Sequence, residues 1–174
     1  NKLDIDCMDG YKELKFRTPE SSIYLGLYEH LGAIPTAMDM SEVFTALENG
    51  TVDGSESPLF TIHSNSWYES AKHLTIDNHI YACNPILISS RVFKKFPEAV
   101  QNMLRETCAE AAGWEREKTT AEEDGVILKI EEAGVTVTRL SEDALKEIQS
   151  AVKSVWEDAS AKIGEDIISK VSGY

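Results

Sequence analysis

The sequence predicts an α/β fold, and three observations support this. Short strand-like segments alternate with helical segments through the first half of the chain, with short turns between them. Pro19 and Gly32 stand where a strand and a helix are expected to end. Two long stretches of the second half carry apolar residues every three or four positions, which is typical of helices. Strands that alternate with helices in this way are typical of parallel α/β units.

The first half is predicted to run strand, helix, strand, helix, strand. Ser21 or Ser22 is expected to cap the first helix, and Ser41 the second, because a serine hydroxyl accepts hydrogen bonds from the first free N–H groups of a helix. Glycines follow both helices. The expected elements are strand 14–17, helix 21–31, strand 35–38, helix 41–50 and strand 51–56.

The rest of the chain is predicted to be mostly helical. Pro58 suits the first turn of a helix that Ser57 caps. Residues 78–90 are rich in Ile, Leu and Tyr, which predicts a long buried strand. Three tryptophans fall on helical stripes and are expected in the core: Trp67, Trp114 and Trp156. The expected elements are helix 58–73, strand 78–90, helix 97–134, strand 135–138 and helix 141–163.

Composition excludes several classes of function. The chain has 174 residues, 42% of them apolar, and a net charge of -13. Such a charge argues against nucleic acids and anionic membrane surfaces, both of which attract Lys and Arg. We expect no membrane span, because no apolar run approaches about 18 residues. The start of the chain, which has no initiator Met and no apolar leader, favours a piece of a longer protein.

Arg17 is the first candidate for a binding residue. It ends the first predicted strand, and no Lys or Arg follows until Lys72, although that interval holds eight carboxylates. A guanidinium is a permanently charged planar fork that can hold a carboxylate through two hydrogen bonds. Ligands of open α/β sheets lie beyond the carboxyl ends of the strands. The alternative interpretation is a surface ion pair, for instance with Glu20.

Glu56 and Ser57 follow the third predicted strand and are further candidates. Ser57 and the helix end after it offer hydrogen-bond donors to an anion. A carboxylate such as Glu56 repels an anion unless it pairs with Arg17, binds a cation or accepts hydroxyl hydrogens. The four histidines and three cysteines lack the spacing of a zinc site, and no nucleophile or cofactor motif occurs. No catalytic residue, metal site or cofactor is predicted.

Several segments together resemble the solute-binding proteins of tripartite ATP-independent periplasmic (TRAP) transporters, the DctP-like family. The resemblance covers about residues 12–171 and includes a Phe-Pro-Glu-Ala-Val-Gln helix start and a later Glu-Ala-Gly-Val. In the first half its segments are Lys15-Phe16-Arg17-Thr18-Pro19, Leu31-Gly32-Ala33-Ile34-Pro35-Thr36, Ser41-Glu42-Val43-Phe44-Thr45-Ala46-Leu47, Val52-Asp53-Gly54-Ser55-Glu56-Ser57-Pro58, Trp67-Tyr68-Glu69 and Leu74-Thr75.

The resemblance implies a periplasmic-binding-protein-like lobe (type II) with long C-terminal helices, from a two-lobed protein whose first lobe is not in this sequence. It implies an α/β lobe over 1–78, a crossing strand and long helix returning toward the first lobe over 79–134, and a strand and helix packing on the α/β lobe over 135–174. The expected protein is periplasmic, is not an enzyme, and passes a small organic acid to a membrane permease. A C4-dicarboxylate, a sugar acid or a keto acid would suit.

The resemblance also implies residue roles. Arg17 would grip the ligand carboxylate, and Met40 stands where the family often has an aromatic residue that lines the cleft. Tyr81 and Asn84 lie in the strand that borders the cleft. Ser57 replaces an Asn that often contacts ligand in the family's Gln-Glu-Asn-Pro motif. The predicted ligand-binding set is therefore Arg17, Ser57, Glu56, Met40, Tyr81 and Asn84.

Two other functions stay open on the sequence. The first is an enzyme of small-acid metabolism that uses Glu56 or His79 as a base. The second is a fragment that acts as an interaction or oligomerisation module through its long helices, without binding a ligand. Such a module would self-associate through the surface that the first lobe would cover.

Overall fold

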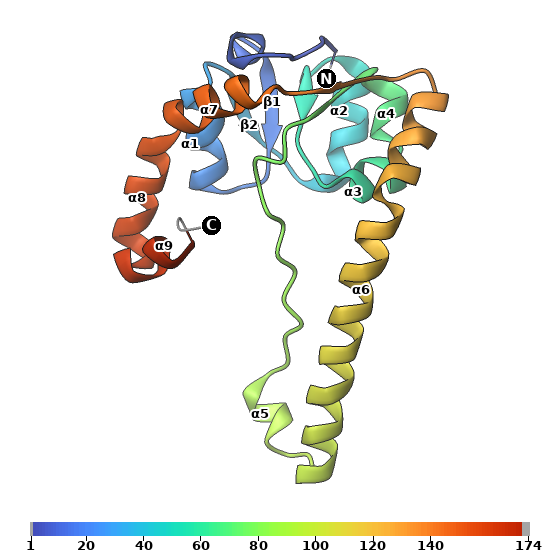
Figure 1. Cartoon of the computed structure of the whole chain (residues 1–174), viewed down its shortest axis with the longest axis vertical. Coiled ribbons are helices and arrows are strands. Elements are labelled where there is room, and N and C mark those ends of the chain that lie inside the picture. Colours follow the sequence, from blue (N-terminus) through green and yellow to red (C-terminus); the bar gives the residue numbers. More distant parts are fainter. Residues whose placement is uncertain (1, 172–174) are drawn as a thin grey trace.

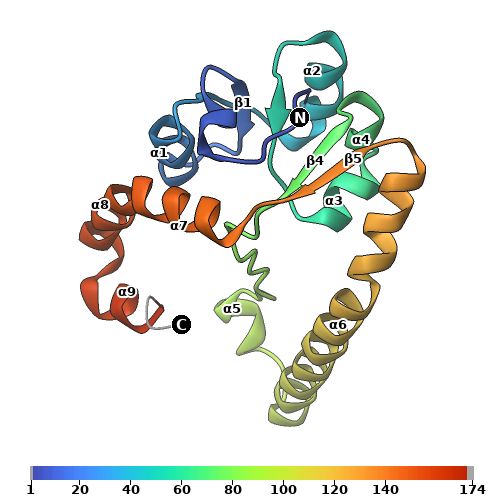
Figure 2. The same ribbon diagram turned by 45° about the horizontal axis from the view of Figure 1, so that its top comes forward.

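The computed structural model describes residues 2–171 and contains two parallel sheets with helices around them (Figures 1 and 2). The predicted α/β class is confirmed. The larger sheet has the strand order β2-β1-β3, and the smaller sheet pairs β4 with β5. The strands are β1 (Lys15–Thr18), β2 (Ile34–Ala37), β3 (Gly54–Ser55), β4 (His73–Ile76) and β5 (Thr136–Arg139).

The first half follows the predicted order of strands and helices. The short helix η1 (Met8–Tyr11) precedes β1, α1 (Ser22–His30) joins β1 to β2, and α2 (Val43–Asn49) joins β2 to β3. The predicted cap Ser41 lies instead inside a 3-10 turn, η2 (Met40–Glu42). At its start, the backbone N–H of Asp39 donates to the Glu42 carboxylate at 3.3 Å.

The predicted helix 58–73 is wrong. The chain forms two short helices, α3 (Leu59–Ser64) and α4 (Trp67–Ser70), and then strand β4. Ser66 lies between the helices with φ of 55°, a left-handed conformation that ends helical hydrogen bonding. Pro58, rather than the predicted Ser57, occupies the position before α3.

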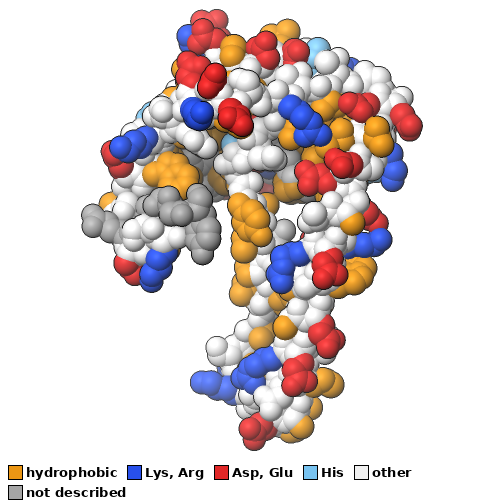
Figure 3. Space-filling view, viewed as in Figure 1, with side chains coloured by type: hydrophobic (Ala, Val, Ile, Leu, Met, Phe, Trp, Pro, Cys, Tyr) orange, Lys and Arg blue, Asp and Glu red, His pale blue; other side chains and the backbone are white. Residues whose placement is uncertain are grey.

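The predicted buried strand 78–90 is also wrong. Residues 77–89, the extended segment, belong to no strand, and within them Asn78 is left-handed with φ of 48°. Helix α5 (Ser90–Phe93) begins within the predicted range. The side chains of Tyr81 and Leu87 are 85% and 84% exposed. The space-filling view shows the exposed apolar side chains along this extended segment (Figure 3). The apolar composition predicted burial, but among the described residues no surface covers these side chains.

The long helix predicted from Pro97 to Gly134 is confirmed as α6 (Glu98–Glu132). Its 35 residues extend for about 50 Å, and it leaves the sheets to run beside the extended segment (Figure 1). Its final turns are buried against α3, α4 and β4. Trp114, in its exposed middle part, is 64% exposed, so the prediction of a core position is wrong.

The predicted final helix 141–163 is divided into α7 (Glu142–Ala151) and α8 (Lys153–Ile163), and α9 (Glu165–Val171) follows. Ser141 caps α7 as predicted, because its hydroxyl accepts from the Ala144 N–H at 3.2 Å. The helical pattern breaks at Val152, which links α7 to α8 with ψ of 7°. Trp156 on α8 is 46% exposed, against the prediction, whereas Trp67 is 3% exposed as predicted.

Three apolar clusters hold these elements together. The largest joins η1, β1 and α1 to α7 and α8, the second lies beneath α2 and α4, and the third fixes the end of α6 to α3, α4 and β4. Within residues 2–171, no helix is both long and apolar enough to cross a bilayer. The division of the chain at 78 and 134 stays a prediction.

Candidate functional site

The carboxyl ends of the three parallel strands of the larger sheet bring the first candidate residues together. Arg17 on the central strand β1 lies opposite Thr36 of β2 and Ser55 of β3. Because the strands are parallel, the residues after β2 and β3 lie at the edge of the sheet where β1 ends. Met38 follows β2 there, and Glu56 follows β3.

The Arg17 side chain is 4% exposed and held in one orientation. Its Nε and Nη2 atoms donate to the carbonyl oxygen of Met38, at 3.0 and 2.7 Å. Within residues 2–171 the guanidinium forms no ion pair closer than 4.0 Å, and Nη1 makes no hydrogen bond. Arg17 therefore does not form the surface ion pair with Glu20 that was the alternative interpretation.

Burial lowers the pKa of Arg17 from its ordinary value, and the negative charges of Glu56 and Asp39 partly oppose this change. An arginine stays protonated at physiological pH in such surroundings. The sheet edge thus carries a permanent positive charge. Glu56 and Asp39 act on this charge without an ion pair at contact distance.

Glu56 is a partly buried carboxyl close to this charge. Burial raises the pKa of Glu56, His79 and Arg17 lower it, and Asp77 raises it, with a net increase from the ordinary value of 4.5. Of the three roles left open for Glu56, pairing with Arg17 does not occur at contact distance. Across the described part of the chain, no three His, Cys, Asp or Glu side chains are grouped to hold a metal ion.

A groove of about 470 Å³ lies between the α/β body, the start of the extended segment and the middle of α6. Of the predicted binding residues, the groove brings together Glu56, Ser57 and Tyr81. Tyr24 of α1 also lines it, and the charge of Glu56 adds to burial in raising the pKa of Tyr24.

Three predicted residues do not line the groove: Arg17, Met40 and Asn84. Arg17 lies buried at the strand edge next to it. Met40 lies in η2 and is 49% exposed, and Asn84 is exposed on the extended segment. The binding roles of all six residues stay predictions.

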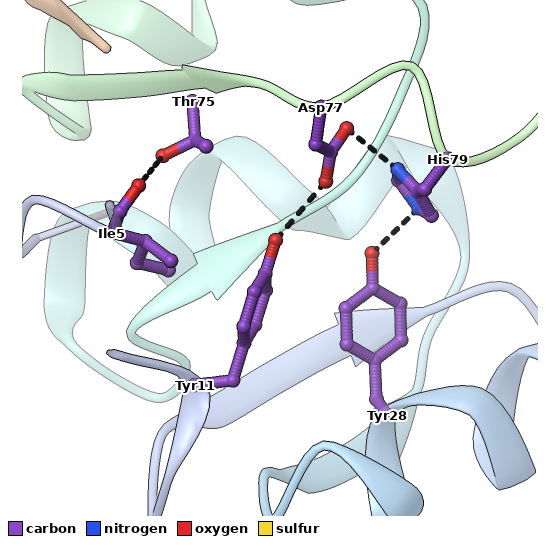
Figure 4. A network of polar contacts seen from close by, with 6 residues as sticks. All are labelled: Ile5, Tyr11, Tyr28, Thr75, Asp77 and His79. Carbon is purple, nitrogen blue, oxygen red and sulfur yellow. Dashed lines mark hydrogen bonds and ion pairs between the residues drawn. The ribbon is translucent and has the colours of Figure 1, made fainter. Parts of the chain in front are cut away.

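A hydrogen-bonded chain of four side chains forms one wall of the groove (Figure 4). The Tyr11 hydroxyl donates to Asp77 Oδ2 at 3.0 Å, Asp77 Oδ1 lies 2.7 Å from His79 Nδ1, and His79 Nε2 lies 3.0 Å from the Tyr28 hydroxyl. Sequence reasoning missed Tyr11, Tyr28 and Asp77 and considered His79 only as a possible base. The Asp77-x-His79 spacing directly after an apolar segment was the signal that could have found them.

The ionisation states of these four side chains follow from their burial and contacts. Burial alone would raise the pKa of Asp77, but the hydrogen bond and positive charge of His79, together with the Tyr11 hydrogen bond, outweigh it and lower the net pKa. Burial raises the pKa of Tyr11 and of Tyr28, so both hydroxyls keep their protons. Asp77 is therefore a carboxylate that accepts from both neighbours.

Comparison with known proteins identifies the kind of protein that has this architecture. Residues 1–162 match the model of DctP, bacterial extracellular solute-binding protein, family 7. A solute-binding protein of Verminephrobacter eiseniae is 35% identical over 126 residues, which are 72% of this chain and 38% of that protein. The sialic acid-binding periplasmic protein SiaP of Vibrio cholerae is 26% identical over 168 residues, which are 97% of this chain and 51% of SiaP.

A solved structure gives the same result for the fold. The TRAP periplasmic solute-binding protein of Xanthobacter autotrophicus Py2, with bound β-D-galacturonate, has a TM-score of 0.91 and 29% identity, over 99% of this chain and 57% of that one. The type of lobe implied by the resemblance is thereby confirmed. The chain spans about half the length of the curated relatives it matches.

Proposed function

The chain belongs to the DctP family of bacterial extracellular solute-binding proteins, and we propose that it is the carboxylate-binding part of a periplasmic TRAP solute-binding protein. In this proposal the protein captures a small organic acid and delivers it to a membrane permease. The relatives are named as solute-binding proteins, not as enzymes, and we propose a binding role without catalysis here.

The position of Arg17 is the observation that carries this proposal. Its guanidinium is fixed by Met38 at the carboxyl edge of a parallel sheet, and one side of the planar fork lacks a partner among residues 2–171. A ligand carboxylate is the natural acceptor for two parallel N–H groups. We expect the carboxylate to bind there, with the rest of the ligand in the adjoining groove.

The groove wall supports a ligand that carries polar groups besides its carboxylate. Glu56 and Ser57 lie in the wall together with Tyr81. A hydroxyl group of the ligand can donate to Glu56, while Ser57 can donate to a ligand oxygen. Galacturonate and sialic acid, the ligands named for two relatives, each combine a carboxylate with hydroxyls. C4-dicarboxylates and keto acids remain candidates of the same class.

A thermal-shift screen tests this proposal. It uses the longest form of the protein, which means this chain together with any sequence encoded on either side of it. The panel contains galacturonate, sialic acid, succinate and pyruvate, each paired with a neutral analogue that lacks the carboxylate, such as galactose for galacturonate. A ligand that binds the native state raises the melting temperature according to its concentration relative to Kd. We expect at least one acid to raise it and its neutral analogue to have no effect. Equal shifts with neutral analogues, or none with any acid on a broader panel, contradict the proposal.

The exposed apolar segment favours a second candidate function, a module that associates with other protein. Tyr81, Ile86 and Leu87 are 85%, 63% and 84% exposed. A contiguous exposed apolar strip of this kind is typical of a surface that contacts other protein. Covering by another lobe of the same protein fits the main proposal, whereas self-association fits the alternative. Size-exclusion chromatography with light scattering on the longest form separates them, because a monomer excludes the oligomerisation module.

A further inference from the structure

The hydrogen-bonded chain Tyr11–Asp77–His79–Tyr28 spans the point where the extended segment leaves the α/β body (Figure 4). Asp77 follows β4 directly, and His79 is two residues into the extended segment. Tyr11 belongs to η1, and Tyr28 to α1, so both partners come from the body around the larger sheet. The first residues of the segment are thus attached at two points to a part of the structure that is distant in sequence.

The two tyrosines are themselves fixed by packing. Tyr11 is 3% and Tyr28 is 1% exposed. The Tyr28 ring stacks on Phe16 with centroids 4.2 Å apart, and Tyr11 packs edge-on against Phe16 at 6.0 Å. Phe16 precedes Arg17 on β1. The hydroxyls that hold Asp77 and His79 therefore sit on aromatic rings fixed to the strand that carries the candidate anion contact.

The ionised carboxylate of Asp77 also sets the direction of its hydrogen bond with His79. Asp77 is ionised and can only accept, so the proton between it and His79 lies on Nδ1. His79 Nε2 and the Tyr28 hydroxyl lie 3.0 Å apart, and this bond forms in either protonation state of the ring: a neutral imidazole accepts from the hydroxyl, and a protonated one donates to it. The ring of His79 is held on both sides. Replacing Tyr28 by Phe removes one of these bonds and keeps the aromatic packing.

We infer that this chain of side chains is a clamp that fixes the direction in which residues 78–89 leave the α/β body and so positions Tyr81 at the groove. Tyr11, Asp77, His79 and Tyr28 act as positioning residues. The consequence for ligand affinity rests on the proposed function, whereas the orientation of the segment does not. Among the described residues the segment pairs with no strand, so no sheet hydrogen bonds would set its path if the clamp were lost.

Distance measurement between two spin labels tests the clamp directly. Cys83 is exposed on the segment and does not line the groove, so it is a suitable labelling site. The second label goes on Glu48→Cys, at an exposed position of α2, with Cys7→Ser and Cys108→Ser to leave two thiols. The ligand-free, longest form of the protein is compared with its Tyr28→Phe variant. Tyr24→Phe is the control for this distance, because Tyr24 lies on the same helix and its hydroxyl forms no hydrogen bond within residues 2–171.

We expect Tyr28→Phe to broaden the distance distribution at least twofold and Tyr24→Phe to leave it unchanged. Tyr11→Phe, which removes the bond at the other end of the chain, serves as a second variant and should broaden it as well. Affinity for an acid that the wild type binds should fall about fivefold in Tyr28→Phe, the change that loss of one hydrogen bond produces.

Three outcomes test the clamp and separate it from a general loosening of α1 and from the proposed function. Unchanged distance distributions in both Tyr28→Phe and Tyr11→Phe overturn the clamp. Equal broadening in Tyr24→Phe also overturns it, because the effect then follows from loosening of the helix as a whole. If the wild type binds no organic acid but Tyr28→Phe broadens the distribution, the proposed function fails and the clamp stands.

Discussion

The Nε and Nη2 atoms of Arg17 share one acceptor, the carbonyl oxygen of Met38, at 3.0 and 2.7 Å. A backbone carbonyl beyond the end of β2 therefore fixes the plane of a guanidinium on β1. The contact uses the side edge of the fork and leaves the Nη1 end without a hydrogen-bond partner in the described part of the chain. This arrangement holds a positive charge in a fixed direction without neutralising it, which is the property that an anion site needs.

The first prediction is that Arg17→Lys, which keeps the charge and removes the fork, weakens binding of the organic acid at least tenfold. A lysine is a point charge on a flexible stem and cannot hold both Met38 and a carboxylate in one plane. Isothermal titration calorimetry on the longest form measures the change. Arg139→Lys is the matched control, since Arg139 also ends a parallel strand but is exposed. Equal affinity in wild type and Arg17→Lys would remove Arg17 from the site.

The second prediction concerns Glu56→Gln and pH. Burial raises the pKa of Glu56 above its ordinary value of 4.5. A group with a raised folded-state pKa favours folding below its ordinary pKa, and this contribution is lost as pH rises through the raised value. The ionised carboxylate therefore costs stability at neutral pH. We expect Glu56→Gln to unfold a few degrees higher than wild type near pH 7, and the difference to shrink below about pH 4.5.

Thermal unfolding followed by circular dichroism between about pH 4 and pH 8, without ligand, measures this difference. Glu48→Gln provides the control, because Glu48 is exposed on α2 and its replacement should have no pH-dependent effect. A stabilisation by Glu56→Gln that stays constant over the whole range would show that ionisation of Glu56 is not its cause.

The third prediction tests how α6 is attached. Ile130 is fully buried in the cluster that joins the end of α6 to α3, α4 and β4, whereas Leu128, two residues before it, is 57% exposed. Ile130→Ala should lower the free energy of unfolding by about 3 kcal/mol, since it removes buried methyl groups and leaves a cavity. Leu128→Ala should change it by less than about 0.5 kcal/mol. Urea unfolding measures both, and equal losses would contradict this attachment.

Local sequence signals were enough for the elements whose partners lie nearby in the chain. The order of strands and helices in residues 14–56 and the long α6 were predicted from capping residues, glycines and periodicity, and the structure confirms them. The predicted helix 58–73 failed because Ser66 adopts a left-handed conformation that no glycine signals. Strand β4 (His73–Ile76) was missed because the predicted helix was extended to residue 73 and the next strand was placed at 78–90.

Burial and the groove wall were less predictable. Leu87 and Trp114 are apolar residues at regular positions, and composition alone could not show that both are exposed among the described residues. The position of Arg17 near the end of a strand was predicted and is confirmed, whereas its binding role stays a prediction. The bond of Tyr28 to His79 joins residues 51 positions apart, and that of Tyr11 to Asp77 residues 66 apart, so only the folded chain brings them together.

The last prediction compares two glycines with open space around them. Gly134 links α6 to β5 with φ of +81°, and Gly113 lies in the middle of α6, and at both positions an added Cβ meets no atom within 4 Å. Sterics with neighbours therefore cannot distinguish the two alanine variants, and backbone conformation decides. Gly134→Ala should destabilise the protein by about 1 kcal/mol, because the left-handed region is costly for an L side chain. Gly113→Ala should stabilise it by about 0.5–1 kcal/mol, since alanine is the better helix former. Urea unfolding of both variants should thus give changes of opposite sign, and a loss of stability in Gly113→Ala would mean that this glycine is needed for a contact with further protein along α6.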